Sequence, residues 1–208
     1  MTALLDAIAR AFVAPTTVPR AEPASAVAAP SAAVCGPGAE PVACSLALLL
    51  RRRGPVIVCR WGVGGRRGAL PASAGARRLA ASMNARGLSA QASGRLVSVA
   101  LDEMPSVAAA EAARATAAAG EAPVVLALCG PRDPAFDDVL AAQDVAIVAV
   151  QDAPQELVRL AVAALEQRTR RAVAAPLPGA PSAWLARTGI WAGPGARRAL
   201  AGATDGLR

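Results

Sequence analysis

The chain has 208 residues, a mean hydropathy of +0.39 and a formal net charge of +7 at pH 7. It contains no lysine, histidine or tyrosine, so all 22 basic residues are arginines, a bias typical of a GC-rich genome. This composition excludes a histidine base, a Schiff-base lysine, a tyrosine acid and a histidine-ligated metal, and the length predicts one domain with a real core.

Three features predict a cytoplasmic protein, at most peripheral to the membrane. No apolar run reaches the roughly 18–20 residues that span a bilayer. Asp6 and the lack of a basic leader argue against a signal peptide. Four cysteines without C-x-x-C spacing indicate reduced thiols.

The first two predicted segments precede the domain. Residues 1–13 form an amphipathic helix, since Leu4, Leu5, Ile8 and Phe12 recur at helical spacing. A helix this short is marginal alone in water, so we expect it to dock on another surface. Residues 14–31 are rich in proline, alanine, threonine and serine and are predicted to be a linker.

Residues 32–171 alternate between apolar strands and helices. The strands are nearly continuous apolar runs, which are typical of a parallel sheet covered by helices on both faces. We therefore predict a three-layer α/β fold with a mainly parallel sheet. The predicted strands are 32–35, 56–60, 95–101, 123–129 and 145–150, and the predicted helices are 41–53, 72–86, 105–119, 135–142 and 154–170.

Residues 172–208 are predicted to be a proline- and glycine-rich C-terminal extension. Trp184, Leu185 and Trp191 lie there near several arginines and have two interpretations. They dock on the protein's own body, or they contact a partner or a membrane.

The segment Val34–Pro41 lies between the first strand and its helix, where an NTPase holds its phosphates. Such a loop needs a lysine for the β- and γ-phosphates and a serine or threonine for Mg²⁺. This chain has Ala39 and Glu40 there instead. A carboxylate at a helix start repels phosphate and competes for the same amides, so we expect a phosphate-loop architecture without phosphate chemistry.

With these elements placed, the chain resembles the MinD/ParA branch of P-loop NTPases, whose deviant Walker A loop reads K-G-G-x-G-K-T-T. Gly36 and Gly38 match family glycines, whereas Ala39 stands at the P-loop lysine and Glu40 at the magnesium-binding threonine. The resemblance covers residues 32–167, and the divergent TadZ/CpaE relatives, which localise pilus machinery, are the subgroup it suggests.

Three later segments carry the same resemblance. The strand Val56–Trp61 resembles the family's V-L-L-V-D-x-D strand, with Cys59 at an aspartate position. Cys129 stands at the aspartate of the D-x-P strand. Asp144 matches the aspartate of the L-x-x-A-D strand. The resemblance implies a P-loop NTPase-like fold with a degenerate nucleotide site formed by Gly36, Gly38, Ala39, Glu40, Cys59 and Cys129.

The cysteines have two interpretations. Cys35, Cys59 and Cys129 end strands at one sheet edge, and Cys44 begins the helix after the loop. They are small buried hydrophobes that replace lost acids, or they form a thiol-based metal or redox site. Their spacing matches no zinc pattern, so we expect no metal.

Charge is strongly segregated along the chain. Residues 41–101 contain ten arginines and no acidic residue, whereas residues 102–158 carry a net charge of −8. Either the two halves neutralise each other, or the arginines form a face for DNA, anionic lipid or an acidic partner. The predicted anion-binding residues are Arg60, Arg66, Arg67, Arg77 and Arg78.

Together these features favour a non-catalytic scaffold or localisation protein with a protein partner or a homodimer, no catalytic residue and no cofactor. Two alternatives stay open. One is a weak nucleotide-binding ATPase that uses arginine in place of lysine, and the other is a basic DNA-binding accessory protein.

Overall fold

A computed structural model describes residues 29–36, 39–61, 70–101, 107–120, 122–128, 139, 142–151, 154–167, 169, 171–177, 194–205 and 207. The predicted helix 1–13, most of the linker and residues 178–193 lie outside these ranges.

The described residues form one seven-stranded sheet in the order β3-β4-β2-β5-β1-β6-β7. Every neighbouring pair is parallel except β3 and β4, which are antiparallel. The strands are β1 (Ser31–Cys35), β2 (Val56–Trp61), β3 (Ser89–Ser93), β4 (Leu96–Leu101), β5 (Val124–Leu128), β6 (Val145–Gln151) and β7 (Ala172–Leu177).

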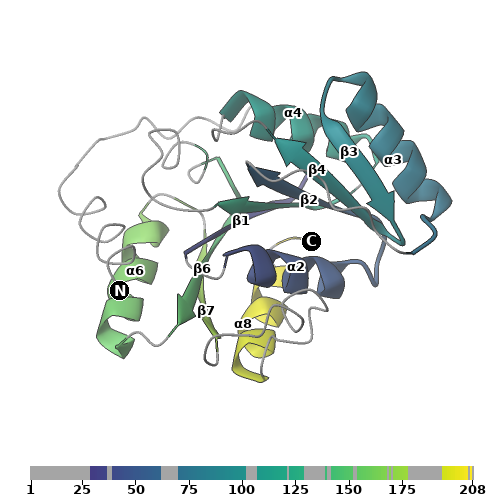
Figure 1. Cartoon of the computed structure of the whole chain (residues 1–208). Helices are drawn as coiled ribbons and strands as arrows, with labels where there is room; N and C mark the ends of the chain where they lie inside the picture. Colours follow the sequence, from purple (N-terminus) through teal and green to yellow (C-terminus); the bar gives the residue numbers. More distant parts are fainter. Residues whose placement is uncertain are drawn as a thin grey trace.

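Helices cover both faces of the sheet. One face carries α2 (Ala39–Leu50) and α8 (Pro194–Asp205), and the other carries α3 (Ala74–Ala85), α4 (Val107–Ala118) and α6 (Gln155–Glu166). Figure 1 shows α2 and α8 below the sheet and α3 and α4 above it. The structure confirms the predicted three-layer α/β fold with a mainly parallel sheet.

The central strands are buried on both faces, as their sequences predict. In β1, Ala33 and Cys35 join the core under α3 and α4, whereas Ala32 and Val34 join the core under α2. This alternation follows from the two-residue period of a strand, and apolar residues on both faces are what a parallel sheet covered by helices requires.

Strand β3 was not predicted. Its sequence, Ser-Ala-Gln-Ala-Ser, has no bulky or β-branched side chain, so strand propensity gives no signal. The strand forms because Gly94, with φ of +58°, lets a tight turn fold it back on β4. At its other end, the Asn84 side chain accepts the Ala90 amide at 2.8 Å and donates to its carbonyl oxygen at 3.0 Å.

The domain also continues beyond residue 171, where the sequence placed its end. β7 pairs with β6 as an edge strand of the sheet. In α8, Leu200 and Ala203 are buried against the α2 side of the core. The expected C-terminal extension therefore contributes a strand and a helix to the domain, since small alanines can pack closely even in a proline-rich segment.

The connections that follow β1 and its neighbour β6 run to opposite faces of the sheet. The helix after β1 is α2, and the helix after β6 is α6 on the other side of the sheet. In open α/β sheets, such a point at the carboxyl ends of the strands is where ligands bind. The carboxyl end of β1 is therefore the candidate site.

Candidate functional site at the carboxyl edge of the sheet

The chain passes directly from β1 through the candidate loop into α2. Cys35 ends β1, Gly36 begins the turn, and α2 starts at Ala39. The predicted strand, turn and helix are thus present, although Gly38 lies outside the described residues. Glu40 falls in the first turn of α2, where only its backbone is described.

Gly36 is fixed by its surroundings. Its φ of +101° is a conformation that side chains disfavour, and a Cβ there would lie 2.6 Å from the carbonyl oxygen of Ala149 on β6. The Gly36 carbonyl also accepts the Ala39 amide at 3.0 Å. One amide at the start of α2 is therefore already satisfied inside the turn.

Ala39 presents no functional group to the edge. Its side chain is 3% exposed and belongs to the core beneath α2, with Val42 and Ala43. At this position the resembled family uses a lysine, and here a buried methyl group completes the packing of the helix.

Cys35 and Cys59 are both buried, but only Cys35 ends its strand. β2 continues to Trp61, and Cys59 is in register with Leu126 of β5, level with Ala33 of β1, so the prediction that Cys59 ends its strand at this edge is wrong. Burial raises the pKa of each thiol from 9.0 to about 12, an effect that a backbone hydrogen bond slightly opposes at Cys35. Cys35 Sγ also donates to the Ile147 carbonyl at 3.5 Å. Both groups are then neutral thiols at physiological pH, which favours the interpretation of the cysteines as small buried hydrophobes.

Cys44 on α2 is half-buried, and Cys129 lies outside the described residues. Among the described cysteines, aspartates and glutamates, no group of three is placed to hold a metal ion. This part of the chain also has no helix long and apolar enough to cross a membrane.

The predicted anion-binding arginines do not form one group. Arg60 lies near the carboxyl end of β2, where its backbone alone is described. Arg77 and Arg78 are exposed near the start of α3, which begins at the opposite, amino edge because the Ser73 amide donates to the Gly94 carbonyl at 2.7 Å. Arg66, Arg67, Trp184, Leu185 and Trp191 lie outside the described residues and stay predictions.

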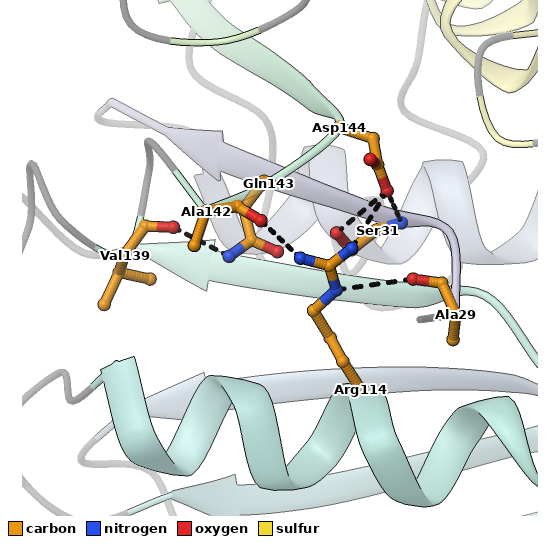
Figure 2. Close-up of polar contacts among 7 residues, drawn as sticks. All are labelled: Ala29, Ser31, Arg114, Val139, Ala142, Gln143 and Asp144. Atoms are coloured by element: carbon orange, nitrogen blue, oxygen red, sulfur yellow. Dashed lines mark hydrogen bonds and ion pairs between the residues drawn. The ribbon is translucent and has the colours of Figure 1, made fainter. Parts of the chain in front are cut away.

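The most extensive polar cluster of the described residues also lies at the amino edge (Figure 2). Arg114 on α4 pairs with Asp144 at 3.3 Å and donates to the carbonyl oxygens of Ala29 and Ala142. Asp144 Oδ2 in turn accepts the Ser31 amide at 2.9 Å. This half-buried cluster ties α4 to the starts of β1 and β6. The predicted match at Asp144 therefore has a structural role here, away from the candidate site.

Comparisons with known proteins find only weak similarity to this chain. A comparison with protein-family models finds no match, and a comparison with curated proteins finds none either. Among solved structures, the chain is similar to a ParA family ATPase from Chlorobium tepidum TLS, at 12% sequence identity and a TM-score of 0.48. The match covers 77% of this chain and 79% of that chain. A likeness of this size says nothing about activity.

Proposed function

We propose that this chain is a non-catalytic scaffold or localisation protein of the MinD/ParA type, in which the nucleotide edge is filled by packing. The observation that carries the proposal is that the described side chains at and beside the phosphate- and magnesium-binding positions of the resembled family are uncharged and buried. Cys35, Ala39 and Cys59 are buried, and each stands on or next to the elements that hold phosphate or magnesium in the resembled family.

These side chains lack the charges that phosphoryl transfer needs. Phosphoryl transfer depends on cations that neutralise the phosphates and on acids that hold Mg²⁺. A methyl group and two neutral thiols supply neither. The protein then acts by binding partners through its surface, and so positions pilus or secretion machinery, the septum or the chromosome. The TadZ/CpaE-like role is the most specific form of this proposal.

Phosphate release from millimolar ATP with Mg²⁺ tests the non-catalytic part. We expect the rate to equal that of a heat-denatured sample. Mg²⁺-dependent release well above that rate would contradict the proposal. If Arg60→Ser or the double variant Arg66→Ser/Arg67→Ser then abolished the release, the chain would be an ATPase that uses arginine in place of lysine.

A fluorescent fusion of the full chain tests the localisation part. We expect it to concentrate at discrete positions in the cell and to keep that pattern in a variant that carries Ala39→Ser at the edge. A uniform distribution of a folded fusion would contradict a localisation role.

A further inference from the structure

Three segments that are separate in sequence meet at the amino edge of the sheet, and each carries arginines. The Arg95 guanidinium, in the β3–β4 turn, lies 3.3 Å from the carbonyl oxygens of Arg51 and Arg52 at the end of α2. The Ser73 amide, at the start of α3, donates to Gly94 at 2.7 Å. Together these segments form the amino-edge arginine cluster, which consists of Arg51, Arg52, Arg53, Arg77, Arg78 and Arg95. Figure 1 shows the end of α2, the start of α3 and the tip of β3 converging at the right of the molecule.

The cluster has no ion-pair partner in the described part of the domain. All of its members except the half-buried Arg51 are exposed. Within the described residues, Arg114 and Asp144 form an ion pair, and no arginine of the cluster lies within ion-pair distance of a carboxylate. No described carboxylate therefore pairs directly with these six arginines. Their mutual repulsion favours an external anion.

An exposed leucine accompanies the charge. Leu70 is 60% exposed, against 43% for Leu160 on α6, the other large apolar side chain exposed among the described residues. Ser93 Oγ lies 3.4 Å from both the amide nitrogen and the carbonyl oxygen of Leu70. The leucine is thus held beside the β3–β4 turn, next to Arg95, where it offers an apolar contact within a basic surface.

The combination of exposed arginines with one exposed leucine distinguishes between classes of anionic partner. A nucleic-acid backbone offers phosphates but nothing apolar for Leu70, and the described part of the cluster has no aromatic ring for base stacking. Stable membrane binding takes a broader apolar face than one leucine. An acidic protein segment with aliphatic side chains supplies carboxylates for the guanidinium groups and a contact for Leu70.

We infer that the amino-edge arginine cluster and Leu70 form a docking surface for an acidic protein segment that carries aliphatic side chains. This inference rests on the proposed function, because a scaffold acts through such surfaces. It also places that surface at the edge of the sheet opposite to the degenerate nucleotide site.

Fluorescence anisotropy with two labelled peptides tests the inference. One peptide is all glutamate, and the other has leucine at every fourth position. We expect the leucine peptide to bind the full chain about tenfold more tightly, which corresponds to about 1.4 kcal/mol. Leu70→Ser should remove that difference, whereas Leu160→Ser on α6 should preserve it.

A matched pair of charge variants tests the arginines. Arg52→Ser/Arg53→Ser/Arg78→Ser should weaken binding of the leucine peptide about tenfold or more, since each surface ion pair contributes modestly. Arg86→Ser/Arg159→Ser/Arg198→Ser removes the same charge from exposed sites outside the cluster, and should change affinity by less than about threefold. Unchanged melting temperatures in both variants show that these arginines act at the surface.

Three outcomes overturn the inference. They are equal binding of the two peptides, no binding of either, and tighter binding of a short DNA duplex or of phosphatidylglycerol vesicles with no effect of Leu70→Ser. The last outcome would show that the surface binds DNA or an anionic membrane through charge, without a contribution from Leu70. Mg²⁺-dependent ATP hydrolysis would contradict the proposed function without changing the peptide results, so the two failures are distinguishable.

Discussion

At the residue scale, the candidate site differs from a nucleotide site in what its side chains do. Ala39 completes the core under α2, Cys35 is buried at the end of β1, and Cys59 is buried inside β2. The sequence itself shows that these positions carry no lysine or acidic group, and burial was one of the two interpretations of the cysteines. The burial of Ala39 was not readable from the sequence, because it depends on how α2 packs on the sheet.

The two buried thiols give the first prediction. Cys35 and Cys59 should remain unmodified by iodoacetamide at pH 8 in the native protein and react after unfolding, since their pKa values are raised to about 12 and both are buried. Peptide mapping by mass spectrometry after labelling measures this. Rapid native labelling of either thiol would mean that the edge is open and its thiol ionised.

The same shift predicts a pH dependence of stability. Each thiol loses its proton near pH 9 in the unfolded chain but only near pH 12 in the folded chain. The free energy of unfolding should therefore fall as pH rises from 9 toward 12, because the unfolded chain releases these protons in that range and the folded chain keeps them. Below pH 9 the two thiols should cause no change. Cys35→Ala/Cys59→Ala should flatten this part of the curve in denaturant titrations, and an identical slope in both proteins would contradict the burial.

Arg114 and Arg78 should differ in how much each contributes to the stability of the fold. Arg114→Ala should lower the free energy of unfolding by about 2–4 kcal/mol, because it removes the ion-pair partner of Asp144 and the donor to two carbonyl oxygens of the half-buried cluster. Arg78→Ala, at an exposed position, should change it by less than about 0.5 kcal/mol. Urea titrations of both variants make the comparison, and equal losses would argue against a structural role for the cluster.

At the element scale, the sequence predicted the strands and helices that have a strong apolar pattern and missed those without one. For the apolar strands β1, β5 and β6, each predicted end differs from the observed end by no more than one residue. β3 was missed because Ser89–Ser93 is small and polar, and its pairing depends on a turn. β7 and α8 were hidden by neighbouring proline and glycine, although packing against β6 and α2 holds them in the domain.

Gly36 provides the element-scale prediction. Gly36→Ala should lower the free energy of unfolding by about 2–3 kcal/mol, because φ is positive and the new Cβ would meet the Ala149 carbonyl on β6. Gly54→Ala is the matched control, since a Cβ there meets nothing within 4 Å and its φ is not in the positive range. Thermal denaturation compares them. If both glycines tolerate alanine equally, the turn is not packed against β6 as described.

At the scale of the whole molecule, the fold separates two edges with different characters. The carboxyl edge, where α/β proteins bind ligands, has buried Cys35 and Ala39 at the end of β1 and the start of α2, and the amino edge carries the arginine cluster. The sequence showed the charge segregation, but it grouped Arg60 with Arg77 and Arg78. Only the direction of α3 shows that these residues lie at opposite ends of the sheet.

The central claim is that this phosphate-loop architecture no longer binds nucleotide. Calorimetric titration of the full chain with ATP in the presence and absence of Mg²⁺ tests it most directly. We predict no Mg²⁺-dependent heat of binding up to millimolar ATP, since Ala39 supplies no charge and its amide is already bonded to Gly36. A saturable, Mg²⁺-dependent site with micromolar affinity would contradict the account.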